Sequence, residues 1–248
     1  YDKPILDNLN EPLVAAQIRD TLKGFYGVLK EQDANLQFVF MTGVTKFSKV
    51  SLFSGLNQLI DITIDEEFSS ICGYTDMDLR EHFSEYLAGS DPEEVRRWYN
   101  GYSWTGHNAV YNPYDILLFI KKRMVYQNYW FETGTPTFLI KLMRKRFTYK
   151  LEEIEVSNLI LESFRLEKFE ELDLSSLLLQ TGYLTIKKIT PSETFILDYP
   201  NKEVRQAFGQ FLLSEYTHTP VTVPYGPNIL EALTQNNLEN VIKIINDL

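Results

Sequence analysis

Apolar residues recur at helical spacing near the start of the chain and then give way to a short uncharged run. The apolar positions of residues 11–30 are Leu13, Ile18, Leu22, Phe25 and Leu29. They fall on one face of a helix. Residues 36–41, LQFVFM, are short, aromatic and free of charge, which is typical of a buried strand. A helix followed by a buried strand predicts α/β packing.

The middle of the chain shows a series of helix starts. Thr75 is followed three residues later by Asp78, a pattern that predicts a capped helix through residue 87. Ser90-Asp91-Pro92, Asn112-Pro113 and Thr135-Pro136 place proline at the first helical position. They predict a helix from residue 92, one to about residue 124 and one to about residue 147. Residues 101–111, GYSWTGHNAVY, predict a turn or small hairpin.

The last third alternates between helical and strand patterns. Asp173 caps a short apolar helix that stops at Gly182. Residues 183–189 and 194–198 predict two strands joined by a turn. A helix follows over residues 202–216, then a proline-containing loop over 217–227 and two short helices. Helices followed by a two-stranded ribbon resemble a winged helix.

Composition limits the classes of protein that need to be considered. The 248 residues are 44% hydrophobic, enough to bury a sizeable core. Cys72 is the single cysteine, which excludes an internal disulfide and suits a reducing compartment. The net charge of −10 disfavours general binding to nucleic acid, although local patches could still bind. No apolar run reaches membrane-spanning length. The chain opens at Tyr1 without methionine, and we expect it to be a fragment.

Searches for a self-sufficient active site are negative. The sequence contains no Gly-Lys pair, so the phosphate-binding loop G-x-x-x-x-G-K-[ST] is absent. Its three histidines are far apart, and we predict no metal site. Ser54 lacks the glycine of a G-x-S-x-G nucleophile turn. No Glu-x-Lys occurs, so a complete metal-dependent nuclease core of that type is not expected in this sequence.

Four sequence runs resemble one family, in the order that the family shows. They are YDKP at 1–4, TGVTKFSKVSLFSGLNQLIDIT at 42–63, WYNGYSW with VYNP at 98–113, and LLLQTGYLTIKK with FILDYPNKEVRQAF at 177–208. The family is the AAA-ATPase-like family of bacterial proteins, usually followed by a PD-(D/E)XK nuclease-like domain. In it, YDKP follows the Walker B strand ending in Asp-Glu. The resemblance therefore implies that this strand and the P-loop lie before Tyr1.

The resemblance also implies roles for individual residues. Thr42, at the end of the predicted strand, would be a sensor-1-like residue that touches the γ-phosphate, with Lys46 offsetting phosphate charge. Asp2, adjacent to the Walker B acids, would orient a magnesium-bound water, and Arg144 in the lid would reach the nucleotide. Each has a structural alternative. Thr42 could end a strand in an ordinary turn, Asp2 could cap a segment, and Arg144 could favour a helix C-terminus without any function.

Two further features have alternative interpretations. Aromatic residues between 98 and 111 could stack on bases, but such density favours a small-domain core. They are Trp98, Tyr99, Tyr102, Trp104 and Tyr111. The helix over 174–181 has no basic residue, which favours a structural or protein-contact role over reading DNA.

Together these observations predict an α/β fold with an incomplete P-loop, AAA-like sheet. We expect the second half of an α/β module over 1–70, a helical lid over 71–150, a winged-helix-like α+β domain over 151–219 and the start of a nuclease-like domain over 220–248. The intact cytoplasmic protein would use ATP and Mg²⁺. Its partners would be its own upstream P-loop segment and downstream nuclease-like domain, with self-association and nucleic-acid binding left open. The alternative functions are a non-catalytic interaction scaffold and, less favoured, a DNA-binding protein.

Overall fold

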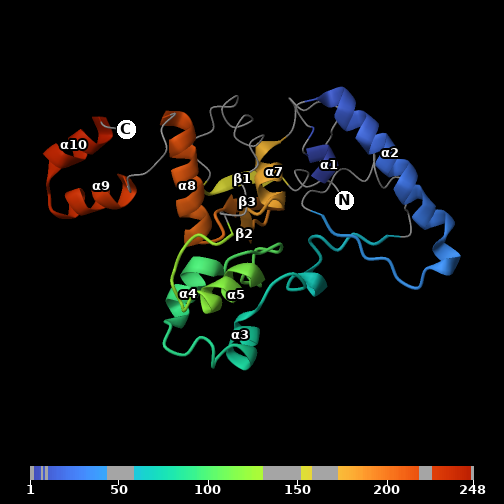
Figure 1. The fold of residues 1–248 in the computed structure, drawn as a ribbon, viewed down its shortest axis with the longest axis horizontal. Coiled ribbons are helices and arrows are strands. Elements are labelled where there is room, and N and C mark those ends of the chain that lie inside the picture. The colour runs from blue at the N-terminus through green and yellow to red at the C-terminus, as the bar shows by residue number, and fades with distance from the viewer. Residues whose placement is uncertain are drawn as a thin grey trace. The chain divides into compact units, whose positions relative to one another are not determined.

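The computed structural model describes residues 3–6, 8, 11–43, 59–130, 152–157, 173–217 and 225–246 (Figure 1). The described helices are α1 (Lys3–Leu6), α2 (Pro12–Glu31), α3 (Asp76–His82), α4 (Pro92–Tyr99), α5 (Pro113–Lys121), α7 (Leu174–Gln180), α8 (Lys202–Thr217), α9 (Tyr225–Thr234) and α10 (Leu238–Asn246). Short 3₁₀ turns are η1 (Asp33–Asn35) and η2 (Glu66–Phe68). The strands are β1 (Ile154–Ser157), β2 (Thr185–Ile189) and β3 (Thr194–Asp198).

Side-chain caps begin several of these helices where the sequence predicts them. Thr75 and Asp78 form a reciprocal capping box at α3, with the Asp78 carboxylate accepting from the Thr75 backbone N–H at 2.7 Å. Asp91, Asn112 and Asp173 each accept a hydrogen bond from a backbone N–H of the first turn of α4, α5 and α7. These contacts satisfy N–H groups that have no partner within the helix. The predicted starts at residues 75, 91, 112 and 173 are confirmed.

Two helices end earlier than the sequence predicts. α3 stops at His82 instead of residue 87, and α5 stops at Lys121 instead of residue 124. After α5, Arg123 and Met124 adopt left-handed backbone conformations with φ of 58° and 62°. A continuous right-handed helix cannot contain such residues, so α5 must end before them. The helix expected over residues 136–147 lies outside the described residues.

The described strands form one antiparallel sheet in the order β1-β3-β2 (Figure 1). The predicted hairpin of residues 183–198 is confirmed as β2 and β3, which pair from Thr185 opposite Asp198. β1 pairs with the other side of β3 and was not predicted, because its four residues are too short to show a clear alternation. β3 is therefore the central strand, and β2 has one side without a strand of this sheet.

Ser103 covers part of that side of β2. Its backbone carbonyl accepts from the Ile186 N–H at 3.2 Å and from the Thr185 hydroxyl at 2.9 Å. Its own N–H donates to the Thr185 hydroxyl at 2.7 Å. Further along, a side chain at Gly106, whose φ is +80°, would have its Cβ 3.1 Å from the Cα of Lys188. The loop over residues 101–111 therefore lies along β2, and its own predicted pairing is confirmed by the bridge between Tyr102 and Val110.

An aromatic core lies between α3, α4, α5 and the loops that join them. Tyr99 is fully buried, and its ring centroid lies 5.4 Å from that of Phe119 and 5.9 Å from that of Tyr129. The Tyr99 hydroxyl donates to the Gln127 carbonyl and accepts from the Gln127 N–H, both at 3.2 Å. The buried members of this cluster are Leu79, Val95, Tyr99, Tyr111, Ile116, Phe119 and Tyr129. The prediction that the aromatic run builds a core is confirmed for Tyr99 and Tyr111.

The predicted strand over residues 36–41 is not a strand in the structure. The segment follows η1 as chain without ladder pairing, and Phe38 and Phe40 are 80% and 52% exposed. Strand pairing needs a neighbouring strand, and no strand in the described part of the chain pairs with this segment. The mixed α and β composition is confirmed, while the incomplete P-loop sheet and the winged-helix-like domain remain predictions.

The chain divides into two compact units, residues 1–205 and 206–248. In the second unit, α9 and α10 contact each other, and Ala232 is buried in α9. Helix α2 and the shorter α1 contact each other within the first unit. The expected boundaries at residues 70, 150 and 219 remain predictions.

Candidate functional site

The four residues predicted to face a nucleotide are not gathered into a described site. Thr42 is exposed in the segment that follows η1, next to Gly43. Asp2, Lys46 and Arg144 lie outside the described residues. The structure therefore leaves the predicted sensor-1, Walker B-adjacent and lid roles as predictions. Across the portion of the chain that is described, no group of three or more His, Cys, Asp and Glu side chains is arranged to hold a metal ion.

The most distinctive chemistry in the described residues is a pair of buried acids. Asp115 in the first turn of α5 and Glu203 in the first turn of α8 are both 0% exposed. Both helices begin at an asparagine cap. Asn112 accepts from the Tyr114 N–H, and Asn201 accepts from the Val204 N–H, each at 3.0 Å. The two caps fix the helix starts and hence the positions from which the acids project.

The two carboxyl groups face each other closely enough to interact directly. Burial raises the pKa of Asp115 first of all, and the charge of Glu203 and a hydrogen bond with its carboxyl add to the effect, bringing the pKa to about 10. Glu203 Oε1 also accepts from the Trp130 backbone N–H at 2.7 Å. The Glu203 carboxyl is therefore bonded to the backbone of the 126–130 segment, and the Asp115 carboxyl lies against that of Glu203.

Two tyrosine side chains lie near enough to the acid pair to interact with its charges. Burial is the main cause that raises the pKa of the Tyr99 and Tyr102 phenols. The negative charges of Asp115 and Glu203 raise both pKa values further. Both phenols therefore stay neutral at physiological pH and can act only as hydrogen-bonding groups. Apart from the Glu203 carboxyl, no group within the described residues gives either buried Asp115 oxygen a hydrogen bond.

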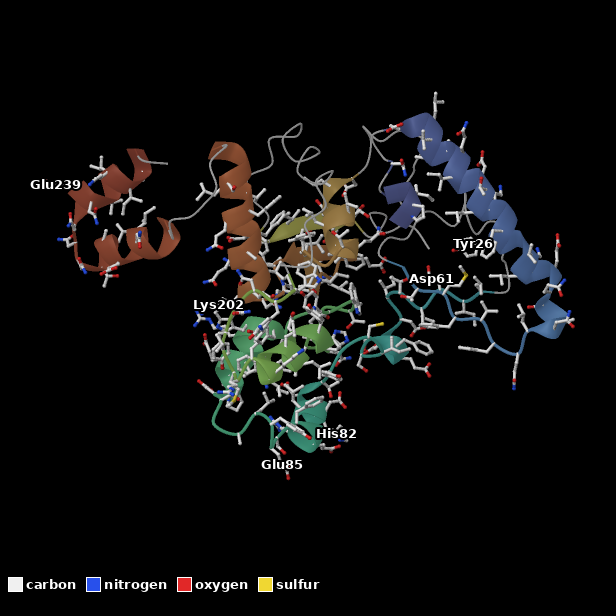
Figure 2. All side chains as sticks on the ribbon, in the orientation of Figure 1. Tyr26, Asp61, His82, Glu85, Lys202 and Glu239 are labelled. Atoms are coloured by element: carbon white, nitrogen blue, oxygen red, sulfur yellow. The ribbon has the colours of Figure 1, made fainter. Side chains whose placement is uncertain are left out.

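A charged network lies near the start of α8 as well. Lys202, labelled in Figure 2, donates to the Glu94 carboxylate at 3.1 Å and lies 4.4 Å from the centre of the Trp98 ring. The Trp98 indole N–H donates to the same carboxylate at 2.8 Å. The bond to Lys202 is the main cause that lowers the pKa of Glu94. These contacts join α4 to the first residue of α8, which directly precedes Glu203 in the sequence.

The acid pair is not accessible to a substrate in the described structure. A general acid or base must come within hydrogen-bond reach of the group it serves, and both side chains are fully buried. Sequence reasoning missed both residues, because an acid in a first helical turn is ordinary. A signal was present at Asp115, which lies one turn before Phe119 on the same face of α5. Glu203 likewise lies one turn before Ala207 on the same face of α8. Phe119 and Ala207 are both buried, so the two acids lie on buried helix faces.

Helix α7 does not present a surface for reading a nucleic-acid groove. Leu174, Ser176, Leu177, Leu178 and Leu179 are buried, which is most of its seven residues. A recognition helix needs exposed donors and acceptors that reach base edges. The burial of α7 favours the structural interpretation over DNA reading.

Comparison with known proteins finds a family model that matches the first part of the chain. Residues 1–53 match the model of the AAA-ATPase-like family, described as "Predicted AAA-ATPase". The match supports an AAA-ATPase-like family. Three of the four residues predicted to face a nucleotide, Asp2, Thr42 and Lys46, lie within the matched residues, and Arg144 lies beyond them.

The chain is also similar to a curated protein over most of its own length. It is 47% identical over 228 residues to a protein of Azotobacter chroococcum mcd 1 named "Uncharacterized protein in vnfD 5'region". The match covers 90% of this chain and 43% of that protein, so the chain spans less than half of the relative's length. No solved structure matches the chain. Among its described helices, none has both the length and the apolar character required to cross a bilayer.

Proposed function

We propose that this chain is part of an AAA-like ATPase and that Thr42 contacts the γ-phosphate of ATP. The observation that carries the proposal is the family match over residues 1–53, which contains Thr42. The exposed position of Thr42 and the adjacent Gly43 support it, because a phosphate needs an accessible hydroxyl and a backbone that permits close approach. The P-loop and the Walker B acids would come from upstream sequence.

In this proposal, Asp2 orients a magnesium-bound water, and Lys46 and Arg144 offset phosphate charge. Mg²⁺, when bound, would neutralise the charge that develops on the transferred phosphate. The attached nuclease-like domain would be the output of the ATPase cycle, in the cytoplasm, where the single cysteine fits a reducing environment. A scaffold without turnover differs in one respect: its upstream phosphate-binding loop and Asp-Glu pair would be degenerate.

The test compares ATP with ADP on the full-length protein. Thr42→Ala is expected to weaken ATP binding by about tenfold to about a hundredfold, the range for one hydrogen bond to a charged group, and to leave ADP binding unchanged. Titration calorimetry with Mg²⁺ present measures both affinities. ADP serves as the internal reference because it lacks the γ-phosphate that Thr42 would contact.

Thr21→Ala is the matched control, since Thr21 is exposed on α2 and its hydroxyl donates to the Gln17 carbonyl. It should leave both affinities unchanged. Equal weakening of ATP and ADP by Thr42→Ala would refute the γ-phosphate contact. The absence of any nucleotide binding by the full-length protein would refute the ATPase proposal itself and favour the scaffold.

A further inference from the structure

The buried acids raise a physical problem that the family resemblance does not address. Asp115 and Glu203 are 88 positions apart and lie on different helices, yet each is 0% exposed. Two ionised carboxylates in contact away from water repel each other and lose their hydration, a combination that proteins avoid. Neither ionised group has a donor, so a hydrogen bond between them requires a proton on one of them.

Asp115 is the group that must carry this proton. Glu203 accepts the Trp130 N–H, a contact that favours its charged form. Neither Asp115 oxygen receives a hydrogen bond from any donor within the described residues. The titratable groups that face Asp115 there are Glu203 from α8, Tyr102 from the 101–111 loop and Tyr99 from α4. None of them supplies positive charge.

We propose that Asp115 is a neutral carboxylic acid in the folded protein, that it donates its proton to Glu203, and that the contact between the first turns of α5 and α8 is thereby coupled to the uptake of one proton. The proposal is independent of nucleotide binding. A neutral Asp115 makes its contact with Glu203 pH-dependent, because any opening that lets water reach Asp115 allows the acid to ionise. Reclosing then requires the proton to return.

The direction of the effect follows from proton counting. In the unfolded chain Asp115 has the ordinary aspartate pKa of about 3.9. In the folded protein burial and Glu203 raise the pKa to about 10. Between these values the folded state holds one more proton than the unfolded state, so stability falls as the pH rises. The unfolding equilibrium constant should increase by about tenfold per pH unit from this group.

The test is urea unfolding of the full chain between pH 5 and pH 9, followed by tryptophan fluorescence. Trp98 and Trp130 are suitable probes, since Trp98 contacts Lys202 at the start of α8 and the Trp130 N–H binds Glu203. Asp115→Asn keeps the shape of the protonated acid and cannot ionise. In this variant the slope of the unfolding free energy against pH should correspond to about one proton less than in the wild-type chain. At pH 8 its unfolding equilibrium constant should be smaller than that of the wild-type chain.

Asp33→Asn, at an exposed position in η1, is the matched control and should retain the wild-type pH dependence. An Asp115→Asn variant with the full wild-type slope would overturn the proposal. If that variant does not fold, infrared spectroscopy of the wild-type chain at pH 7 decides, because a neutral acid gives a distinct carbonyl band and its absence would refute the proposal. A pH dependence that disappears when Mg²⁺ or Ca²⁺ is added would also refute it, since a cation would then replace the proton.

Discussion

Gly101→Ala is expected to destabilise the folded chain by about 3 kcal/mol or more. Gly101 has φ of +111°, where an L-residue is strained by about 1–2 kcal/mol, and its new Cβ would collide with the Pro200 carbonyl oxygen. That oxygen is backbone and accepts a hydrogen bond from the Lys187 ammonium at 3.0 Å, so it has little freedom to move. Overpacking of this kind adds about 1–3 kcal/mol. Urea unfolding followed by tryptophan fluorescence measures the loss.

Gly209→Ala provides the matched control for this change. Gly209 lies within α8, and a Cβ there would have nothing within 4 Å. Alanine in an exposed helix is about 0.5–1 kcal/mol more favourable than glycine, so this variant should be as stable as the wild type or more so. Equal stability of the two alanine variants would contradict the close approach of residue 101 to Pro200.

Tyr99→Ala should cost about 3–5 kcal/mol of folding free energy, the usual range for removing a buried aromatic side chain. Tyr99 is 0% exposed, packs against Phe119 and Tyr129, and makes both hydrogen bonds to Gln127. Its removal leaves a cavity and two unpaired backbone groups. The same urea titration detects the change as a lower midpoint.

Tyr86→Ala tests whether that loss depends on burial. Tyr86 is 63% exposed in the turn that follows α3, and truncating it should change stability by no more than about 0.5 kcal/mol. A similar loss in both variants would mean that Tyr99 does not anchor the core.

Local signals predict the helix starts and the hairpin because the chemistry of each lies within a few residues. A cap such as Thr75 with Asp78 acts over three positions, and the turn between β2 and β3 is equally short. The segment over 36–41 shows the limit. Its composition predicts a strand, but a strand exists only with a neighbour to pair with, and local composition does not encode that neighbour.

The candidate sites show the same distinction. Thr42 was singled out by resemblance to a family, and the match over residues 1–53 supports that family without placing a nucleotide. Asp115 and Glu203 were missed because their importance comes from contact between two distant helices. Each acid taken separately resembles an ordinary helix-start residue. What makes the pair unusual is burial, which depends on tertiary packing.

The contact of Ser103 with β2 has a consequence for association between molecules. An uncovered edge strand offers unpaired N–H and C=O groups on which another chain can add, and this is a common route to aggregation. At the start of β2 the Ile186 N–H is already occupied by the Ser103 carbonyl, and the Thr185 hydroxyl bonds the same residue. Exposed Lys187 and Lys188 follow. A foreign strand would have to displace Ser103 and accept two nearby positive charges before it could extend this sheet.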